Sequence, residues 1–291
     1  MTASPSPTTA LPRRRRARTA RRARPVGALC VAALALALMA PSGPAQAIVG
    51  GTSALPGAYP FMVSLRENGY PYCGGTLVSP QWVLTAAHCV DGHAISALTA
   101  VVNQVEVYGS GGEVRSVDRT AVDPSYDPVS ESFDAALVHL SAPTTGIAAL
   151  PLIRSGDQTT TAAGTVATVI GYGSTDSQPP QGGGSTSFPP DLQQTQVTIT
   201  SDSQCSTVFN GRDEPPVSTG VMLCAGGDGV HDACVGDSGG PLLVPGSASG
   251  AWTDVAITSW GAGCAAAGIP GVYTRLANPS ISAFVAGTIA H

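Results

Sequence analysis

The sequence predicts an all-β fold that ends in one helix. Short apolar or alternating runs recur after residue 48, and Gly, Pro, Asn and Asp separate them. Only residues 279–289 have helical spacing, with Ile281, Phe284, Val285 and Ile289 on one face. The strands that we expect lie at 61–66, 76–84, 104–108, 135–140, 166–170, 194–199, 241–244, 254–260 and 271–275.

Residues 1–47 have the composition of a targeting segment. Eight arginines lie between Arg13 and Arg24, and the apolar run at 26–40 is too short for a comfortable membrane span. Ala45-Gln46-Ala47 then forms an A-x-A cleavage site. We therefore expect a signal peptide at 1–47, with a short propeptide ending at Ala47 as the alternative, and a secreted, extracellular protein. The sequence leaves open whether the general or the twin-arginine route exports it.

Without this segment the chain is strongly acidic. Six arginines and no lysine remain against all nineteen acidic residues, which gives a net charge of −13. Such a balance argues against nucleic acid or an anionic membrane as a partner, although solubility outside the cell alone would also account for it. We expect neither partner, and a monomer.

Six cysteines remain after the targeting segment, because the seventh, Cys30, lies within it. An even set in an exported chain indicates disulfides, and spacing alone allows fifteen connectivities. Metal binding is the competing interpretation of Cys and His. No C-x-x-C or H-E-x-x-H spacing supports it, so we expect no metal and no cofactor.

A candidate nucleophile, Ser238, lies in the segment 232–241, Asp-Ala-Cys-Val-Gly-Asp-Ser-Gly-Gly-Pro. A serine hydroxyl is a poor nucleophile unless a base and an orienting carboxylate assist it. His88 in Thr-Ala-Ala-His-Cys supplies the base, and Asp134 stands before the apolar run 135–138 and supplies the carboxylate. The order His, Asp, Ser is informative as well.

Residues 236–240 also fit G-x-S-x-G, the nucleophile elbow of α/β-hydrolases. That fold needs its acid and then its histidine downstream of the serine. Here His88 and Asp134 precede Ser238, and the downstream candidates Asp254 and His291 leave no room for the required βα units. Chain order therefore disfavours the elbow.

The three segments around His88, Asp134 and Ser238 together resemble the chymotrypsin/trypsin family of serine proteases. The resemblance implies two packed six-stranded antiparallel β-barrels with a C-terminal helix. We place the first barrel at 48–155 and the second, with the helix, at 156–291, because the polar stretch 155–161 separates the halves. It also implies disulfides between Cys73 and Cys89, Cys205 and Cys224, and Cys234 and Cys264.

By the same resemblance, His88 is the general base and acid, Asp134 orients it, and Ser238 attacks the scissile carbonyl. The backbone N–H groups of Gly236 and Ser238 would form the oxyanion hole.

Substrate choice follows from Asp232, which matches the carboxylate at the base of the trypsin pocket. Such a buried charge selects Arg or Lys, because other side chains leave it unpaired. Ala233 lacks the hydroxyl of some relatives, which favours Arg over Lys. The remaining pocket residues, expected to form open walls and a strand that pairs with substrate, are Ser259, Trp260, Gly261, Gly263 and Gly271.

Asp237 adjoins the nucleophile but has no place in the triad. In the family it pairs with a newly formed N-terminal amine, and Ile48-Val49-Gly50-Gly51 resembles that terminus. Because Ala47 stands where many relatives have Arg or Lys, one cut after the A-x-A site would both export the chain and activate it. We therefore predict a mature N-terminus at Ile48.

The resulting hypothesis is a trypsin-like secreted serine endopeptidase that cleaves after Arg and Lys through an acyl-enzyme. Its expected partners are protein or peptide substrates and proteinaceous inhibitors. The alternative is a catalytically silent secreted binding protein on a protease scaffold.

Overall fold

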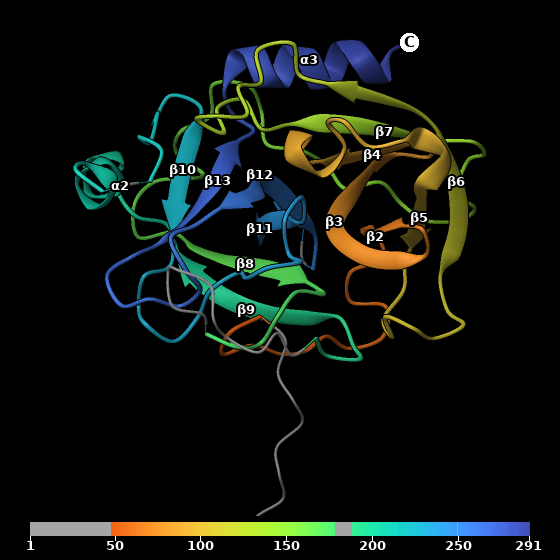
Figure 1. Cartoon of the computed structure of the whole chain (residues 1–291), viewed down its shortest axis with the longest axis horizontal. Helices are drawn as coiled ribbons and strands as arrows, with labels where there is room; N and C mark the ends of the chain where they lie inside the picture. Colours follow the sequence, from red (N-terminus) through yellow and green to blue (C-terminus); the bar gives the residue numbers. More distant parts are fainter. Residues whose placement is uncertain (1–47, 178–187, 213, 249) are drawn as a thin grey trace, which may run out of the picture. The chain divides into compact units, whose positions relative to one another are not determined.

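The structure is a computed structural model that describes residues 48–177, 188–212, 214–248 and 250–291. The predicted signal peptide at 1–47 lies outside the described residues. The strands of the described residues form two antiparallel sheets, and the expectation of an all-β fold with a C-terminal helix is confirmed (Figure 1).

The first sheet is a closed six-stranded barrel in the order β2-β3-β4-β7-β6-β5. Every neighbouring pair is antiparallel. Its strands are β2 (Met62–Glu67), β3 (Tyr70–Ser79), β4 (Trp82–Thr85), β5 (Leu98–Val102), β6 (Glu113–Val122) and β7 (Ala136–Leu140).

The second sheet has seven strands in the order β1-β9-β8-β11-β12-β13-β10. An isolated bridge between Ile199 and Ala225 joins the ends of β9 and β10, so six of the strands curl round into a second barrel and β1 is added at the side. The strands are β1 (Thr52–Ser53), β8 (Val166–Gly171), β9 (Gln193–Thr198), β10 (Met222–Ala225), β11 (Pro241–Pro245), β12 (Trp252–Trp260) and β13 (Gly271–Arg275).

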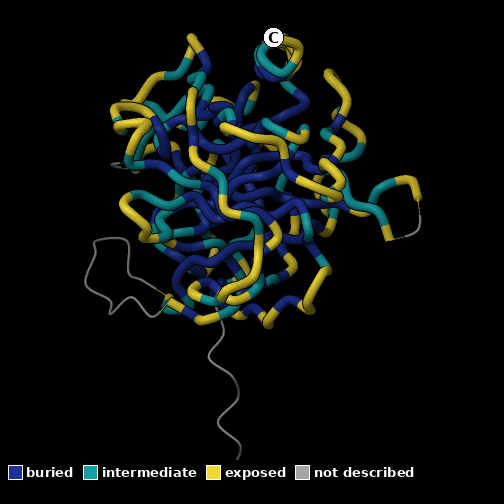
Figure 2. The backbone as a smooth tube through the Cα atoms, turned by 90° about the vertical axis from the view of Figure 1, so that its right-hand side faces the viewer, coloured by how far each residue is buried: buried dark blue, intermediate teal, exposed yellow. Residues whose placement is uncertain are grey.

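The apolar interior follows from the strand pattern. β9 alternates buried and less buried residues, as a strand with one solvated face does, whereas β4 and β13 are buried throughout. Figure 2 shows the buried backbone concentrated inside and the exposed backbone mainly in the outer loops. The two sheets therefore enclose the core, and the loops between strands remain free to carry function.

Helix α3 (Pro279–Ile289) has the predicted bounds, because its start carries clear local chemistry. Asn278 caps it by accepting from the backbone N–H of Ser280 and Ile281, and Pro279 occupies the first turn. The prediction missed α2 (Asp202–Phe209), although Ser201 and Gln204 form a capping box that the sequence contains. Two short 3₁₀ turns, η1 (Ala87–Cys89) and η2 (Ile95–Ala97), complete the helical elements of the described residues.

Some strand predictions were wrong. The range 76–84 is a hairpin, since the turn at Pro80 and Gln81 separates β3 from β4. The range 104–108 is not a strand: β5 ends before Asn103, which has a positive φ of 60°, and the Gln104 side chain bonds Arg66 and Gly109 in a turn. β5, β6 and β10 were not anticipated, and the charges alternating along β6 hid its strand pattern.

All three disulfides expected from the resemblance are present. Cys73 is bonded to Cys89, Cys205 to Cys224, and Cys234 to Cys264. The first ties η1 to β3, and the second ties α2 to β10. The third, Cys234–Cys264, joins the loop before β11 to the loop between β12 and β13.

The two sheets meet at the segment that carries Ser238. The backbone N–H of Gly74 in β3 donates to the carbonyl of Ser238 at 2.7 Å. Gly239 has a φ of 79°, and a Cβ there would lie 2.2 Å from Thr85 Oγ1 and 2.6 Å from the Gly74 carbonyl. Only glycine fits this approach. The Ser238 loop is therefore pressed directly against the first barrel.

A second polar contact links the sheets through a buried carboxyl group. Thr76 Oγ1 in β3 donates to Asp254 Oδ2 in β12 at 3.1 Å, and Asp254 is fully buried. Its other oxygen has no hydrogen-bond partner. The interface between the sheets therefore contains an ionisable group without a cation within hydrogen-bonding reach.

A search of the described residues for a helix with the length and apolar character of a membrane span found none.

Candidate active site

His88 and Asp134 form the core of the site. The His88 ring nitrogen Nδ1 lies 2.8 Å from Asp134 Oδ2, and the His88 backbone N–H donates to Asp134 Oδ1 at 2.9 Å. Asp134 is fully buried, whereas 28% of the His88 side chain is exposed. The Asp134 carboxylate thus contacts both the backbone N–H and the ring of His88. These two contacts fix the position of η1 and the orientation of the imidazole.

Residues of the second sheet complete the surroundings of Asp134. Ser259 Oγ donates to Asp134 Oδ2 at 2.6 Å, and Thr274 Oγ1 donates to the Asp134 carbonyl at 2.9 Å. Each contact crosses from β12 or β13 to the residue just before β7. The orientation of the buried carboxylate therefore depends on both halves of the molecule.

The electrostatics favour a charged imidazole. Burial acts to lower the pKa of His88, but the hydrogen bond and charge of Asp134, together with the charge of Glu131, outweigh burial and raise it above its ordinary value. In the protonated state the ring is stabilised by two nearby acids. This is the environment that a base needs when it must accept a proton from a weakly acidic hydroxyl.

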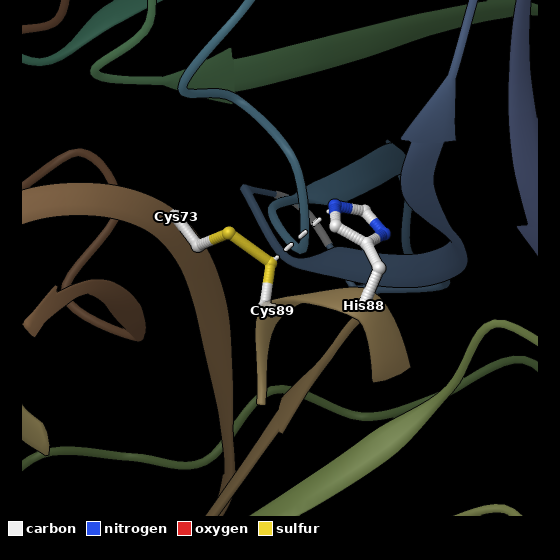
Figure 3. A group of neighbouring side chains, drawn as sticks. All are labelled: Cys73, His88 and Cys89. Carbon is white, nitrogen blue, oxygen red and sulfur yellow. Dashed lines mark hydrogen bonds between the residues drawn. A yellow bond between two sulfur atoms is a disulfide. The ribbon is translucent and has the colours of Figure 1, made fainter. Parts of the chain in front are cut away.

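A disulfide flanks the histidine on its other side. Figure 3 shows the His88 ring beside the Cys73–Cys89 bridge, with Nε2 3.7 Å from Cys89 Sγ. The bridge anchors η1 to β3, the same strand that holds the Ser238 carbonyl. One strand thus positions both the histidine turn and the serine loop.

The Ser238 loop is a tight turn between glycines. Gly236 and Gly239 have φ values of 96° and 79°, which favour glycine. The Gly239 N–H donates to the Thr258 carbonyl at 2.8 Å, and Gly240 donates to Asp237 at 3.0 Å. Ser238 itself is half-buried. Its loop is therefore held between β3 and β12, with the serine at the surface of the cavity described next.

All of the predicted substrate-binding residues share one cavity. It measures about 320 Å³, and all six of them line it together with Ser238: Asp232, Ser259, Trp260, Gly261, Gly263 and Gly271. A Cβ on Gly271 would lie 3.0 Å from Asp232 Oδ1, and one on Gly261 would lie 3.3 Å from the Gly263 carbonyl. Side chains at these two positions would therefore narrow the cavity.

Asp232 is 1% exposed and is incompletely satisfied. Its Oδ2 accepts from the Ala265 N–H at 2.9 Å, while Oδ1 has no hydrogen-bond partner. Burial raises the pKa of Asp232 to about 7; the nearby charges of Asp237 and Asp228 also raise it, against backbone hydrogen bonds from Ala265 and Ala233. A cation entering the cavity would both satisfy Oδ1 and favour the ionised form.

Tyr273 is a cavity residue that the sequence prediction did not assign. It is fully buried and lines the same cavity, and its hydroxyl also lacks a hydrogen-bond partner. Strand alternation was the available clue, because residues i and i+2 share a face and Gly271 was already assigned to the cavity. Asp232 and Tyr273 are therefore two of four cavity residues with an unpartnered buried polar atom; the others are Thr258 and Trp260.

Gly236 lies at a different surface from the other predicted residues. It lines a smaller cavity of about 120 Å³, which includes Tyr72, Tyr108, Tyr172 and Phe188. A Cβ on Gly236 would lie 3.0 Å from Gly173 Cα, so glycine is required there. The loop from Gly236 to Ser238 therefore spans from this aromatic surface to the larger cavity.

Ile48 and Asp237 are both fully buried. Val49 forms an isolated bridge with Asp232, which brings the start of the described chain against the Asp232 segment. Asp237 Oδ1 accepts from Gly173 and Oδ2 from Cys234, both at 2.8 Å. Burial raises the pKa of Asp237 to about 7, with those two bonds opposing. Its cradle requires Gly171 and Gly173, where a Cβ would lie 2.0 Å and 2.5 Å from atoms of the carboxyl group.

Two groups of side chains in the described residues have the proximity of metal ligands. In the first, Cys73 and Cys89 form a disulfide and so offer no thiolate beside His88. The second consists of His88, Glu131 and Asp134, whose candidate ligand atoms all lie within 4.8 Å of one another. Glu131 was not anticipated from the sequence, although it stands only three residues before Asp134.

The fold and this site define a serine protease, and the chain belongs to the trypsin family. The family model described as Trypsin matches residues 48–281. Among curated proteins the chain is 37% identical over 237 residues to human Serine protease 56. The aligned region covers 79% of this chain and 37% of that protein. The chain is 35% identical over 232 residues to Trypsin of Saccharopolyspora erythraea, covering 79% of this chain and 93% of that protein.

Mouse Serine protease 56 is similar to the same extent, at 36% identity over 235 residues, with 79% of this chain and 37% of that protein covered. The chain thus spans little more than a third of the length of the Serine protease 56 proteins and nearly all of the bacterial trypsin.

Proposed function

We propose that this chain is a secreted endopeptidase that cleaves peptide bonds after Arg and, less well, after Lys. Ser238 attacks the carbonyl, His88 transfers the proton, and Asp134 holds the imidazole in the productive tautomer. The N–H groups of Gly236 and Ser238 stabilise the oxyanion. The contact that carries the proposal is the 2.8 Å pair of His88 and Asp134. Ser238 lies at the rim of the Asp232 cavity.

The specificity rests on the cavity. An arginine or lysine side chain supplies the cation that the buried Asp232 lacks, and the free Oδ1 accepts its hydrogen bond. A guanidinium offers several donors in a rigid fork, enough to reach both Asp232 Oδ1 and the Tyr273 hydroxyl. We therefore expect Arg to be preferred over Lys.

Secretion is supported by the three disulfides, which persist in oxidising compartments. It agrees with the arginine-rich segment and the A-x-A site at 45–47. The division at residue 155 into two barrel domains and the monomeric state are part of the same proposal.

The deciding experiment compares arginyl, lysyl and phenylalanyl substrates in the wild type and in Ser238→Ala. We expect arginyl cleavage that falls by at least about 10⁴-fold in Ser238→Ala, because the variant loses only the nucleophilic hydroxyl. His88→Ala should cost about as much, and the double variant little more, since triad members act as a unit. A folded wild type that cleaves none of these substrates would instead support the silent binding protein.

A further inference from the structure

The catalytic histidine has a second acidic neighbour, Glu131. His88, Glu131 and Asp134 each place a side-chain nitrogen or oxygen within 4.8 Å of the other two. The charge of Glu131 also raises the pKa of His88, in addition to the larger effect of Asp134. Asp134 is fully buried beneath the ring, whereas Glu131 is half-buried. Glu131 is therefore the acidic group of this cluster that a bound molecule can contact.

The loop before β7 holds Glu131 in a defined position. Glu131 and Phe133 have φ values of 52° and 55°, a region that side chains other than glycine rarely adopt. Such residues cost of order 1 kcal/mol or more and tend to occur at functional sites. The Tyr126 hydroxyl donates to Glu131 Oε2 at 3.0 Å, and a backbone hydrogen bond of 3.0 Å joins Asp127 to Ser132. The carboxyl group is therefore held in place at some conformational cost.

No arginine of the described residues forms an ion pair with Glu131. None of the ion pairs within the described residues includes it, and the sequence has no lysine. Burial raises the pKa of Glu131, and the charge of Asp134 raises it further. Two acids side by side repel each other, so a cation brought by a ligand would relieve the repulsion.

A substrate passes this carboxyl group if the function proposed above is right. The cleaved residue then points into the Asp232 cavity. Neighbouring side chains of an extended peptide point to opposite faces, so the residue before it points away from the cavity. Ser259 lines the cavity and also donates to Asp134, so one residue separates the cavity from the catalytic pair. The preceding side chain therefore lies over His88, on the side where Glu131 stands.

We propose that Glu131 is a specificity-determining residue that selects a basic side chain immediately before the cleaved Arg or Lys. The preferred substrates are then protein segments with two consecutive basic residues. Because the contact is half-exposed, its contribution is modest; such pairs are typically worth about 0.2–1 kcal/mol, or up to about five-fold in rate.

The test uses peptides that differ only in the residue X before a cleaved arginine, with X as Arg, Gln or Glu. For the wild type we expect kcat/KM to follow the order Arg, Gln, Glu, with about three- to five-fold between the first two. The Arg-to-Gln ratio should fall to about one in Glu131→Gln, which keeps the size of the side chain and an acceptor for Tyr126. Salt at 1 M should weaken the wild-type preference, since it screens exposed pairs.

The matched control is Asp127→Asn, which removes a carboxylate from the same loop that is also close to Glu131 but not part of the cluster with His88. It should keep the wild-type ratio. A ratio of one in the wild type, or an unchanged ratio in Glu131→Gln, would overturn the inference while leaving arginine specificity intact. A folded wild type that cleaves no arginyl peptide would overturn both proposals. If Glu131→Gln does not fold, the wild-type order and its salt dependence still decide the matter.

Discussion

The buried acid beside His88 has partners that the buried acids of the second half of the molecule lack. In the first barrel Asp134 is saturated: His88 contacts it through the ring and the backbone, and Ser259 donates a third bond. Asp232 and Asp237, in the loop before β11, and Asp254 in β12 are as deeply buried, and none of the ion pairs among the described residues includes them. Burial raises the pKa of these three carboxyl groups to about 7, 7 and 8. His88 and Asp134 are thus arranged for proton transfer. The three acids of the second half would each be stabilised in the ionised form by a positive charge from another source.

This difference teaches where each missing cation would come from. We propose that a substrate side chain reaches Asp232 through the cavity and that the amine of a cleaved N-terminus reaches Asp237. Asp254 faces neither, because it lies between the sheets against Thr76. Replacing each of the three acids in turn therefore separates a binding role, an activation role and a purely energetic one.

The largest effect is expected at Asp232. Asp232→Ser removes the only carboxylate that lines the larger cavity, so kcat/KM for arginyl substrates should fall by about 10⁴-fold, as when a polar site loses its matched group. Steady-state kinetics with arginyl and phenylalanyl esters measure the change, and unaltered phenylalanyl turnover is the control. If the wild type prefers Phe, Leu or Ala, the role of Asp232 is wrong even though the protease proposal survives.

The next effect concerns Asp237 and the chain terminus. N-terminal sequencing of the secreted protein should give Ile48, and Asp237→Asn should lose about 10²-fold or more in activity, because a buried ion pair that loses one partner costs about 3–5 kcal/mol. A chain with an uncleaved Met before Ile48 should be equally impaired. Full activity in a protein that starts elsewhere would rule out direct activation.

The same pair predicts an alkaline limit. For the pair to stabilise the fold, the pKa of the Ile48 amine must exceed the roughly 7.7–8.0 of a free α-amino group. Its contribution is then complete below that range and is lost as the pH rises through the folded value. Activity of the wild type should therefore decline at high pH more steeply than that of Asp237→Asn, which retains no such pair.

A smaller effect is expected at Asp254, and it appears in stability. Its pKa is raised from 3.8 to about 8 by burial, with bonds from Thr76 and the Ala256 backbone opposing. The protonated form favours folding, so its contribution is complete below about pH 4 and is lost as the pH rises through about 8. Asp254→Asn should have a Tm several degrees above the wild type at pH 9 and nearly equal at pH 4. The same difference in Tm between the variant and the wild type at both pH values would contradict this.

The smallest effect is a shift of the pH profile in Glu131→Gln. Glu131 raises the pKa of His88 by its charge, so removing that charge should move the acidic limb of kcat/KM to lower pH. The Asp127→Asn control should leave the limb unchanged. An acidic limb that is unchanged in Glu131→Gln would show that the charge of Glu131 does not affect His88.

Local sequence patterns carried the prediction of the candidate site and of the C-terminal helix. His88, Asp134 and Ser238 each stand within several matching residues, and α3 begins with an Asn-Pro cap that operates without any tertiary partner. The cysteine pairing came from the family resemblance and not from spacing. Such features are readable because they depend on neighbours in the chain or on an entire recognisable motif.

Apart from α2, whose capping box is local, the features that were missed depend on distant contacts. Asp254 looks like any polar residue at the start of a strand until Thr76 packs against it, and Glu131 is ordinary until its backbone turns left-handed beside His88. β6 carries alternating charges on an exposed face, so its sequence resembles a loop more than a strand. Burial and proximity in the folded chain decide these cases, and no local pattern encodes them.

The position of Ser238 depends on how the two sheets are docked, because the Gly74 N–H of the first sheet donates to the Ser238 carbonyl. Because Gly239 fits against Thr85 with no space to spare, a small separation of the sheets would displace the nucleophile while each sheet kept its strands. We therefore expect mild denaturant or pressure to abolish activity reversibly before the β-structure is lost. A ligand that binds between the two sheets and separates them would abolish activity in the same way, without entering the Asp232 cavity.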